Sequence, residues 1–128
     1  MIQPQYHFRR VGNDILIWDV RKLSKLAEPC RTFVVPLCDI KEIDEPYWYD
    51  ATSGTPTCRS VLEHARQVSQ SDLAYPILLC PQGRVVDGMH RVMKAVMMGD
   101  STISARHLPE LPKPDYVNRH PEDLPYGP

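Results

Sequence analysis

Residues 75–99 read YPILLCPQGRVVDGMHRVMKAVMMG, and this stretch decides the fold. The continuous apolar run at 75–80 predicts a short buried strand, and PQGR at 81–84 predicts a tight turn into a second short strand at 85–86. A helix follows and ends at Gly99, a residue typical of the position after the last helical turn. The positions that we expect to face inward on this helix are Val92, Met93, Val96 and Met97.

Strands and helices alternate on both sides of this stretch. We expect a hairpin over 6–20, a helix over 21–28, a strand over 32–40, a helix over about 56–70 and a last strand over 102–108. Asp19 would cap the first helix, and Thr55 and Pro56 would begin the second. The inward positions that we expect on the two helices are Leu23 and Leu26, then Val61, Leu62, Ala65 and Val68. This alternation predicts an α/β or α+β fold, with a mixed β-sheet flanked by helices.

Proline is frequent, at 13 residues against 6 glycines in a chain of 128. Six of these prolines follow Leu108, so residues 109–128 cannot form a helix or a central strand. We expect one domain over 1–108, including the hairpin, and a Pro-rich extended tail over 109–128 that wraps the domain or reaches a protein partner or a second copy. Pro36, inside the expected 32–40 strand, indicates an edge strand or a bulge.

The net charge and the cysteine pattern limit which partners and which cellular compartment we expect. The formal net charge is -1 and the isoelectric point is near 6.5, which argues against non-specific binding to nucleic acid or to an anionic membrane. No apolar run approaches the roughly 20 residues that a membrane span requires. The four cysteines have no C-x-x-C spacing and the N-terminus resembles no secretory signal, so we expect reduced thiols and a cytoplasmic protein.

The VVDGMHR segment at 85–91 carries the most specific chemistry. A strand ends and a helix begins there, so backbone N–H groups and the positive end of the helix dipole are available to an anion. Gly88 would let a phosphate approach the backbone beside Met89. Arg91 would bind the phosphate oxygens in a bidentate manner, and His90 would donate to them or transfer a proton.

Asp87 complicates a phosphate site because a carboxylate repels a phosphate. A Mg²⁺ ion between them would remove the conflict, since Mg²⁺ prefers carboxylate and phosphate oxygens. The segment therefore indicates a nucleotide phosphate with Mg²⁺ held by Asp87. A structural alternative stays open: Asp87 caps the helix, Gly88 only makes a turn, and His90 and Arg91 lie at the surface.

Two further segments contribute candidate residues. Residues 39–50 form an acidic loop interleaved with Tyr47, Trp48 and Tyr49, and one of its carboxylates would reach the Asp87–Arg91 site unless the loop is a solvated face. Arg59, at the start of the 56–70 helix, would add a phosphate contact or lie exposed. The histidines without metal-ligand spacing are His7, His64, His107 and His120.

The stretch from Ala74 to Leu108 resembles the core of the ParB/sulfiredoxin-like superfamily. Its members carry a strand–turn–helix unit with a Gly-x-x-Arg core, here Gly88 to Arg91, whose helix start receives nucleotide phosphates. The upstream VVPLCDIKEID at 34–44 resembles the strand and loop that precede this unit. The resemblance implies a single domain of that fold over most of 32–108.

The branches of this superfamily imply different functions. Sulfiredoxins carry a catalytic Cys where this chain has Met89, and a thioether cannot attack a sulfinyl phosphate, so sulfiredoxin activity is not expected. ParB proteins add a helix-turn-helix domain, which the 20 residues after Leu108 cannot supply. The Asp-Gly-His-His-Arg motif of free serine kinases matches Asp87–Arg91 at four of its five positions. That motif handles nucleotide and metal, and a Glu of the acidic loop acts as base, a role that falls here to Glu42, Asp44 or Glu45.

The sequence therefore predicts a domain that binds a nucleoside di- or triphosphate with Mg²⁺ at the Asp87–Arg91 turn. Its reaction would be phosphotransfer or nucleotide hydrolysis, in which positioning and electrostatics do most of the catalysis. The alternative is a non-catalytic protein-interaction module of the same fold, docking through 109–128. A ParB-like DNA-binding or nuclease role is disfavoured because the chain has no basic stripe and a net charge of -1.

Overall fold

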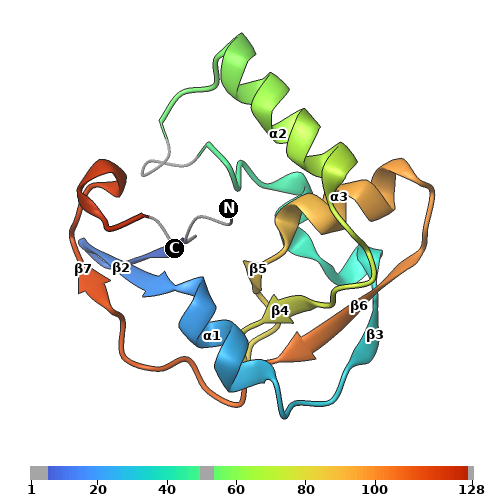
Figure 1. The fold of residues 1–128 in the computed structure, drawn as a ribbon, viewed down its shortest axis with the longest axis horizontal. Helices are drawn as coiled ribbons and strands as arrows, with labels where there is room; N and C mark the ends of the chain where they lie inside the picture. The colour runs from blue at the N-terminus through green and yellow to red at the C-terminus, as the bar shows by residue number, and fades with distance from the viewer. Residues whose placement is uncertain (1–5, 50–53, 127–128) are drawn as a thin grey trace.

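Two β-sheets frame the computed structural model, which describes residues 6–49 and 54–126 (Figure 1). The first sheet is antiparallel, in the order β1-β2-β7, with bounds Tyr6–Val11, Asp14–Asp19 and Tyr116–Val117. The second sheet has the order β3-β6-β4-β5, with bounds Phe33–Pro36, Thr102–His107, Ile77–Leu79 and Val85–Asp87. Its β4 and β6 run parallel while its other neighbours are antiparallel. The predicted α+β fold with a mixed sheet is therefore confirmed.

Three helices and three short 3-10 turns complete the fold. The helices are α1 (Val20–Ala27), α2 (Cys58–Gln70) and α3 (Met89–Met97), and the turns are η1 (Leu37–Asp39), η2 (Lys41–Asp44) and η3 (Pro121–Asp123). α1 begins as predicted, because the Asp19 carboxylate accepts a hydrogen bond from the Arg21 N–H at 2.9 Å. Leu23 is buried, but the inward position predicted for Leu26 is wrong, since Ala27 lies on the same face one turn after Leu23.

The strand predicted over 32–40 is shorter in the structure. β3 ends at Pro36, and two 3-10 turns follow, in which the Ile40 N–H donates to the Leu37 carbonyl. β3 is an edge strand, as Pro36 predicts. The change from strand to 3-10 turn matters for the site because η2 carries the acidic residues of the loop.

The start and the inner face of α2 differ from the prediction. Thr57 is the N-cap instead of Thr55, because Thr57 and Ser60 bond each other reciprocally in a capping box. The predicted apolar stripe is wrong at its first three positions, and Leu62 keeps 50% of its surface exposed. The inner face is the stripe Ser60, His64 and Val68, at successive helical turns.

The predicted end of α3 is confirmed, and its inner face is shifted. Gly99 has φ 78°, and the Asp100 N–H donates to the Ala95 carbonyl across the end of the helix. The buried residues of α3 are Met89, Val92 and Ala95, whereas Val96 and Met97 are exposed. The inward positions predicted for Val96 and Met97 are wrong, because α3 contacts the sheet through Met89, Val92 and Ala95.

β4 is the central element of the core. Ile77 and Leu79 join the buried cluster on the side of α3, while Leu78 and Cys80 join the cluster on the side of the hairpin and α1. Burial of both faces explains the continuous apolar run in this strand. Figure 1 shows α3 and the hairpin on different sides of the β4–β6 region. Within the described ranges, no helix is long and apolar enough to cross a membrane.

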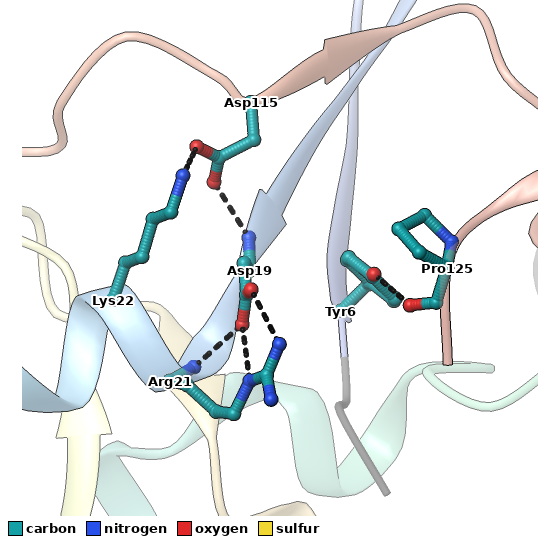
Figure 2. A network of polar contacts seen from close by, with 6 residues as sticks. All are labelled: Tyr6, Asp19, Arg21, Lys22, Asp115 and Pro125. Atoms are coloured by element: carbon teal, nitrogen blue, oxygen red, sulfur yellow. Dashed lines mark hydrogen bonds and ion pairs between the residues drawn. The ribbon is translucent and has the colours of Figure 1, made fainter. Parts of the chain in front are cut away.

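Residues 109–126 fold back onto the hairpin, which is the first of the two courses predicted for the tail. The Trp18 Nε1–H donates to the Pro112 carbonyl at 2.7 Å. Asp115 accepts hydrogen bonds from the Asp19 N–H at 2.8 Å and from Lys22 Nζ at 2.9 Å, and β7 then pairs with β2 (Figure 2). Leu108 is therefore where the chain passes from one sheet to the other, and the folded unit continues beyond it.

Candidate functional site

The turn between β5 and α3 requires glycine at position 88. Gly88 has φ 107° and is the N-cap residue of α3, with no side chain to cap the helix. A Cβ at this position would lie 2.7 Å from Ile77 Cγ2 and 3.0 Å from Arg91 Nη2. Gly88 therefore permits both a left-handed backbone and the close packing of the turn on β4.

Arg91 ties the start of α3 to the segment before β4. Its Nη2 pairs with Asp87 Oδ2 at 2.9 Å, and its Nη1 donates to the carbonyl oxygens of Tyr75 at 3.0 Å and Pro76 at 2.7 Å. The guanidinium thus has protein partners on both terminal nitrogens. The structural alternative for the segment is right about the turn at Gly88 but wrong in two respects: Asp87 pairs with Arg91 instead of capping α3, and Arg91 and His90 are partly buried instead of lying at the surface.

His90 meets a histidine of α2 that sequence reasoning set aside. His64 Nδ1 and His90 Nε2 share a hydrogen bond of 2.8 Å, although 26 positions separate the two residues. The Trp48 ring stacks on both imidazoles, with centroid distances of 4.3 Å to His64 and 4.8 Å to His90. The three rings form one stack that joins α2, α3 and the loop at 42–49.

Both histidines of this stack are neutral at pH 7. Burial, together with the neighbouring His64 and Arg91, lowers the pKa of His90 to about 4. Burial also lowers the pKa of His64. In a neutral pair one imidazole donates and the other accepts, so this hydrogen bond couples the tautomers of the two rings.

The structure separates the three candidate carboxylates of the acidic loop. Glu42 is only 3% exposed, and its Oε2 accepts a hydrogen bond from the Val85 N–H and lies 3.4 Å from Arg84 Nε. Its second oxygen, Oε1, is buried and has no hydrogen-bond partner. Glu45 pairs with Arg84 at the surface. Asp44 borders a separate hollow with Cys38 and Asp100.

A cavity of about 780 Å³ lies between β1, the loop at 42–49 and the start of β5. Besides His64 and Ser60 of α2, its lining includes Glu42, Glu45, Tyr47, Trp48, Arg84, His7, Arg9 and Arg10. Gly88, Met89 and the Asp87–Arg91 pair do not line it, and His90 connects to it through its hydrogen bond to His64. Arg59 borders a different hollow, together with Glu63 and Arg66.

The hairpin supplies site residues for which the sequence carried no functional signal. His7 is 7% exposed, and its Nε2 is buried without a hydrogen-bond partner. Burial lowers the pKa of His7 to about 4, with Arg9 as a smaller cause. The alternation of side chains along β1 is typical of any strand, so it could not have revealed that this strand borders a cavity.

Asp87 is the residue at which the sequence predicts a Mg²⁺ ligand. Asp87 Oδ2 already pairs with Arg91, and the described part of the chain holds no group of three or more His, Cys, Asp or Glu side chains arranged for a metal ion. A Mg²⁺ ion on Asp87 would have to compete with the ion pair to Arg91.

Comparison with protein-family models, curated proteins and solved structures finds no match to this chain.

Proposed function

We propose that the chain binds a nucleotide in the cavity between β1 and the 42–49 loop. The supporting observation is the composition of the cavity wall, which combines the Trp48 ring with the arginines of β1. A base stacks favourably on an aromatic ring, and arginine binds phosphate oxygens in a bidentate manner. The volume of about 780 Å³ lies within the range of small-molecule sites, roughly 300–1,000 Å³.

The proposal moves the phosphate away from the Asp87–Arg91 turn. Arg91 already donates to a carboxylate and two carbonyls, so a phosphate would have to displace these partners. Arg84 pairs with Glu42 and Glu45. Arg9 and Arg10 both line the cavity, and neither makes an ion pair with the residues of 6–49 and 54–126. Arg10 is the more exposed of the two, so we assign the phosphate to Arg10.

The reaction class that we propose is phosphoryl transfer or nucleotide hydrolysis. His64 lines the cavity in its neutral form, and its Nδ1 is engaged by His90. Its Nε2 is then the ring nitrogen left to give or take a proton, with the orientation of the ring set by His90 and Trp48. The stack therefore supplies a general acid or base whose direction is fixed before a ligand binds.

Thermal unfolding with a panel of nucleoside di- and triphosphates, with and without Mg²⁺, tests this function. A nucleotide present at 100 times its Kd is expected to raise Tm by roughly 10 °C, because it binds only the folded state. Arg10→Ala should remove most of this shift. Arg66→Ala is the matched control, since Arg66 is an exposed arginine paired with Glu63 outside the cavity.

Phosphate release measured on the same panel reports whether the bound nucleotide is hydrolysed. If no nucleoside di- or triphosphate raises Tm, nucleotide binding is ruled out. If Arg10→Ala and Arg66→Ala give the same shift as the wild type, the nucleotide binds elsewhere on the molecule.

A further inference from the structure

Two residues that line the cavity each carry a buried side-chain atom without a hydrogen-bond partner. These atoms are Glu42 Oε1 on η2 and His7 Nε2 on β1, and no other buried side-chain nitrogen or oxygen in the described residues lacks a partner. Buried polar groups in folded proteins are almost always hydrogen-bonded, so an unpaired one calls for an explanation. Two of them on one cavity indicate that a ligand completes their hydrogen bonds.

We propose that Glu42 and His7 bind the sugar hydroxyls of the nucleotide, which makes the cavity selective for ribonucleotides over deoxyribonucleotides. This inference rests on the proposed function and adds the part of the ligand that these two residues contact.

Glu42 requires a ligand group that donates a hydrogen bond. Its Oε2 is held by the Val85 N–H and by Arg84, so the orientation of the carboxylate is set by the protein. The remaining oxygen of a carboxylate accepts hydrogen bonds only. A phosphate offers no donor at neutral pH and would be repelled, whereas a hydroxyl or an amino group fits.

His7 suits a hydroxyl for a different reason. Its ring lies 5.8 Å from the Trp18 ring, at the base of the hairpin. A neutral imidazole nitrogen is either a donor or an acceptor, according to the tautomer. A hydroxyl is both, so it satisfies Nε2 in either tautomer.

The sugar is the part of a nucleotide that carries two adjacent hydroxyls. With a base on Trp48 and phosphates on Arg10, the sugar lies between them in the ligand. Carboxylates recognise ribose hydroxyls in dinucleotide-binding folds, which shows that the chemistry is suitable. The competing donor is an amino group of the base, which would engage Glu42 and leave the sugar hydroxyls unused.

Titration calorimetry with paired ligands tests the inference on the unmodified protein. The probes are ATP and GTP, each with its 2′-deoxy and 3′-deoxy forms, and ITP, which lacks the amino group of GTP. Loss of a hydroxyl is expected to weaken binding by about 10-fold or more, because the partner in the protein is then left buried and unpaired. In Glu42→Gln and His7→Phe the ratio of ribo to deoxy affinity should fall toward one.

His107→Phe is the matched control, because His107 stacks on Phe33 outside the cavity and should keep the wild-type ratio. Equal affinity for the ribo and deoxy forms in the wild type overturns the inference and leaves nucleotide binding in place. Weak ITP binding together with equal ribo and deoxy affinities assigns the donor to the base and also overturns it. Absence of binding by every probe contradicts the proposed function itself.

Discussion

Gly88→Ala is expected to lower the free energy of unfolding by roughly 4 kcal/mol. The φ of 107° disfavours any residue with a Cβ, which costs about 1–3 kcal/mol. The new methyl group would also lie 2.7 Å from Ile77 Cγ2, and overpacking of this kind costs about 1–3 kcal/mol more. Domains of this size are stable by about 5–15 kcal/mol, so the variant loses a large part of its stability.

Urea denaturation measures this loss, and Gly99→Ala is its control. Gly99 also has a positive φ, of 78°, but a Cβ there would meet no atom within 4 Å. The control should therefore lose only the backbone part. Equal losses in the two variants would show that the packing of Gly88 on β4 contributes nothing.

Lowering the pH from 7 to 4 is expected to cost about 3 kcal/mol of stability through His7 alone. Burial lowers the pKa of His7 from 6.5 in the unfolded chain to about 4 in the folded protein. Between these values the unfolded state binds more protons, so the free energy of unfolding falls as the pH falls. The stabilisation is complete above about pH 6.5 and is lost as the pH passes through about 4, and each pKa unit corresponds to about 1.4 kcal/mol.

Chemical denaturation of the wild type and of His7→Phe at several pH values between 4 and 8 checks this. The variant keeps a buried ring beside Trp18 and should show a smaller slope of stability against pH. Part of the slope should persist, because the pKa of His90 is lowered in the same direction. His107→Phe should keep the wild-type slope, and an unchanged slope in His7→Phe would contradict the assignment.

The elements that were predicted well depend on short-range signals. Asp19 caps α1 because its carboxylate reaches an N–H two residues away, and Gly99 ends α3 because one backbone conformation is needed there. The fully apolar β4 is recognisable because both of its faces are buried. The predicted N-cap Thr55 was wrong because the reciprocal bond between Thr57 and Ser60 sets the start of α2.

The candidate site could be predicted only in part because long-range packing assembles it. The special backbone at Gly88 and the pairing capacity of Arg91 were apparent from residue type. Arg91 reaches the carbonyls before β4 because of how α3 packs on the sheet. His64 meets His90 because of how α2 packs on α3. Helical periodicity predicted an apolar inner face for α2. The face that packs inward is instead largely polar, and most of the predicted apolar residues are exposed.

The sequence could not distinguish Glu42, Asp44 and Glu45 either, because their positions also depend on long-range packing. Glu42 became the buried carboxylate because η2 turns it toward the Val85 N–H, and a 3-10 turn was not expected there. His7 enters the cavity because the hairpin is held in place by residues 109–126. No local pattern reports a contact between segments so far apart in the chain.

Tryptophan fluorescence during titration with ATP and GTP tests most directly whether a nucleotide occupies the cavity. The chain has two tryptophans: Trp18 is 3% exposed and bonded to the tail, and Trp48 lines the cavity. We expect a saturable change in emission in the wild type that is lost in Trp48→Phe. No saturable change with either nucleotide, or a change of full size that persists in Trp48→Phe, would contradict the account.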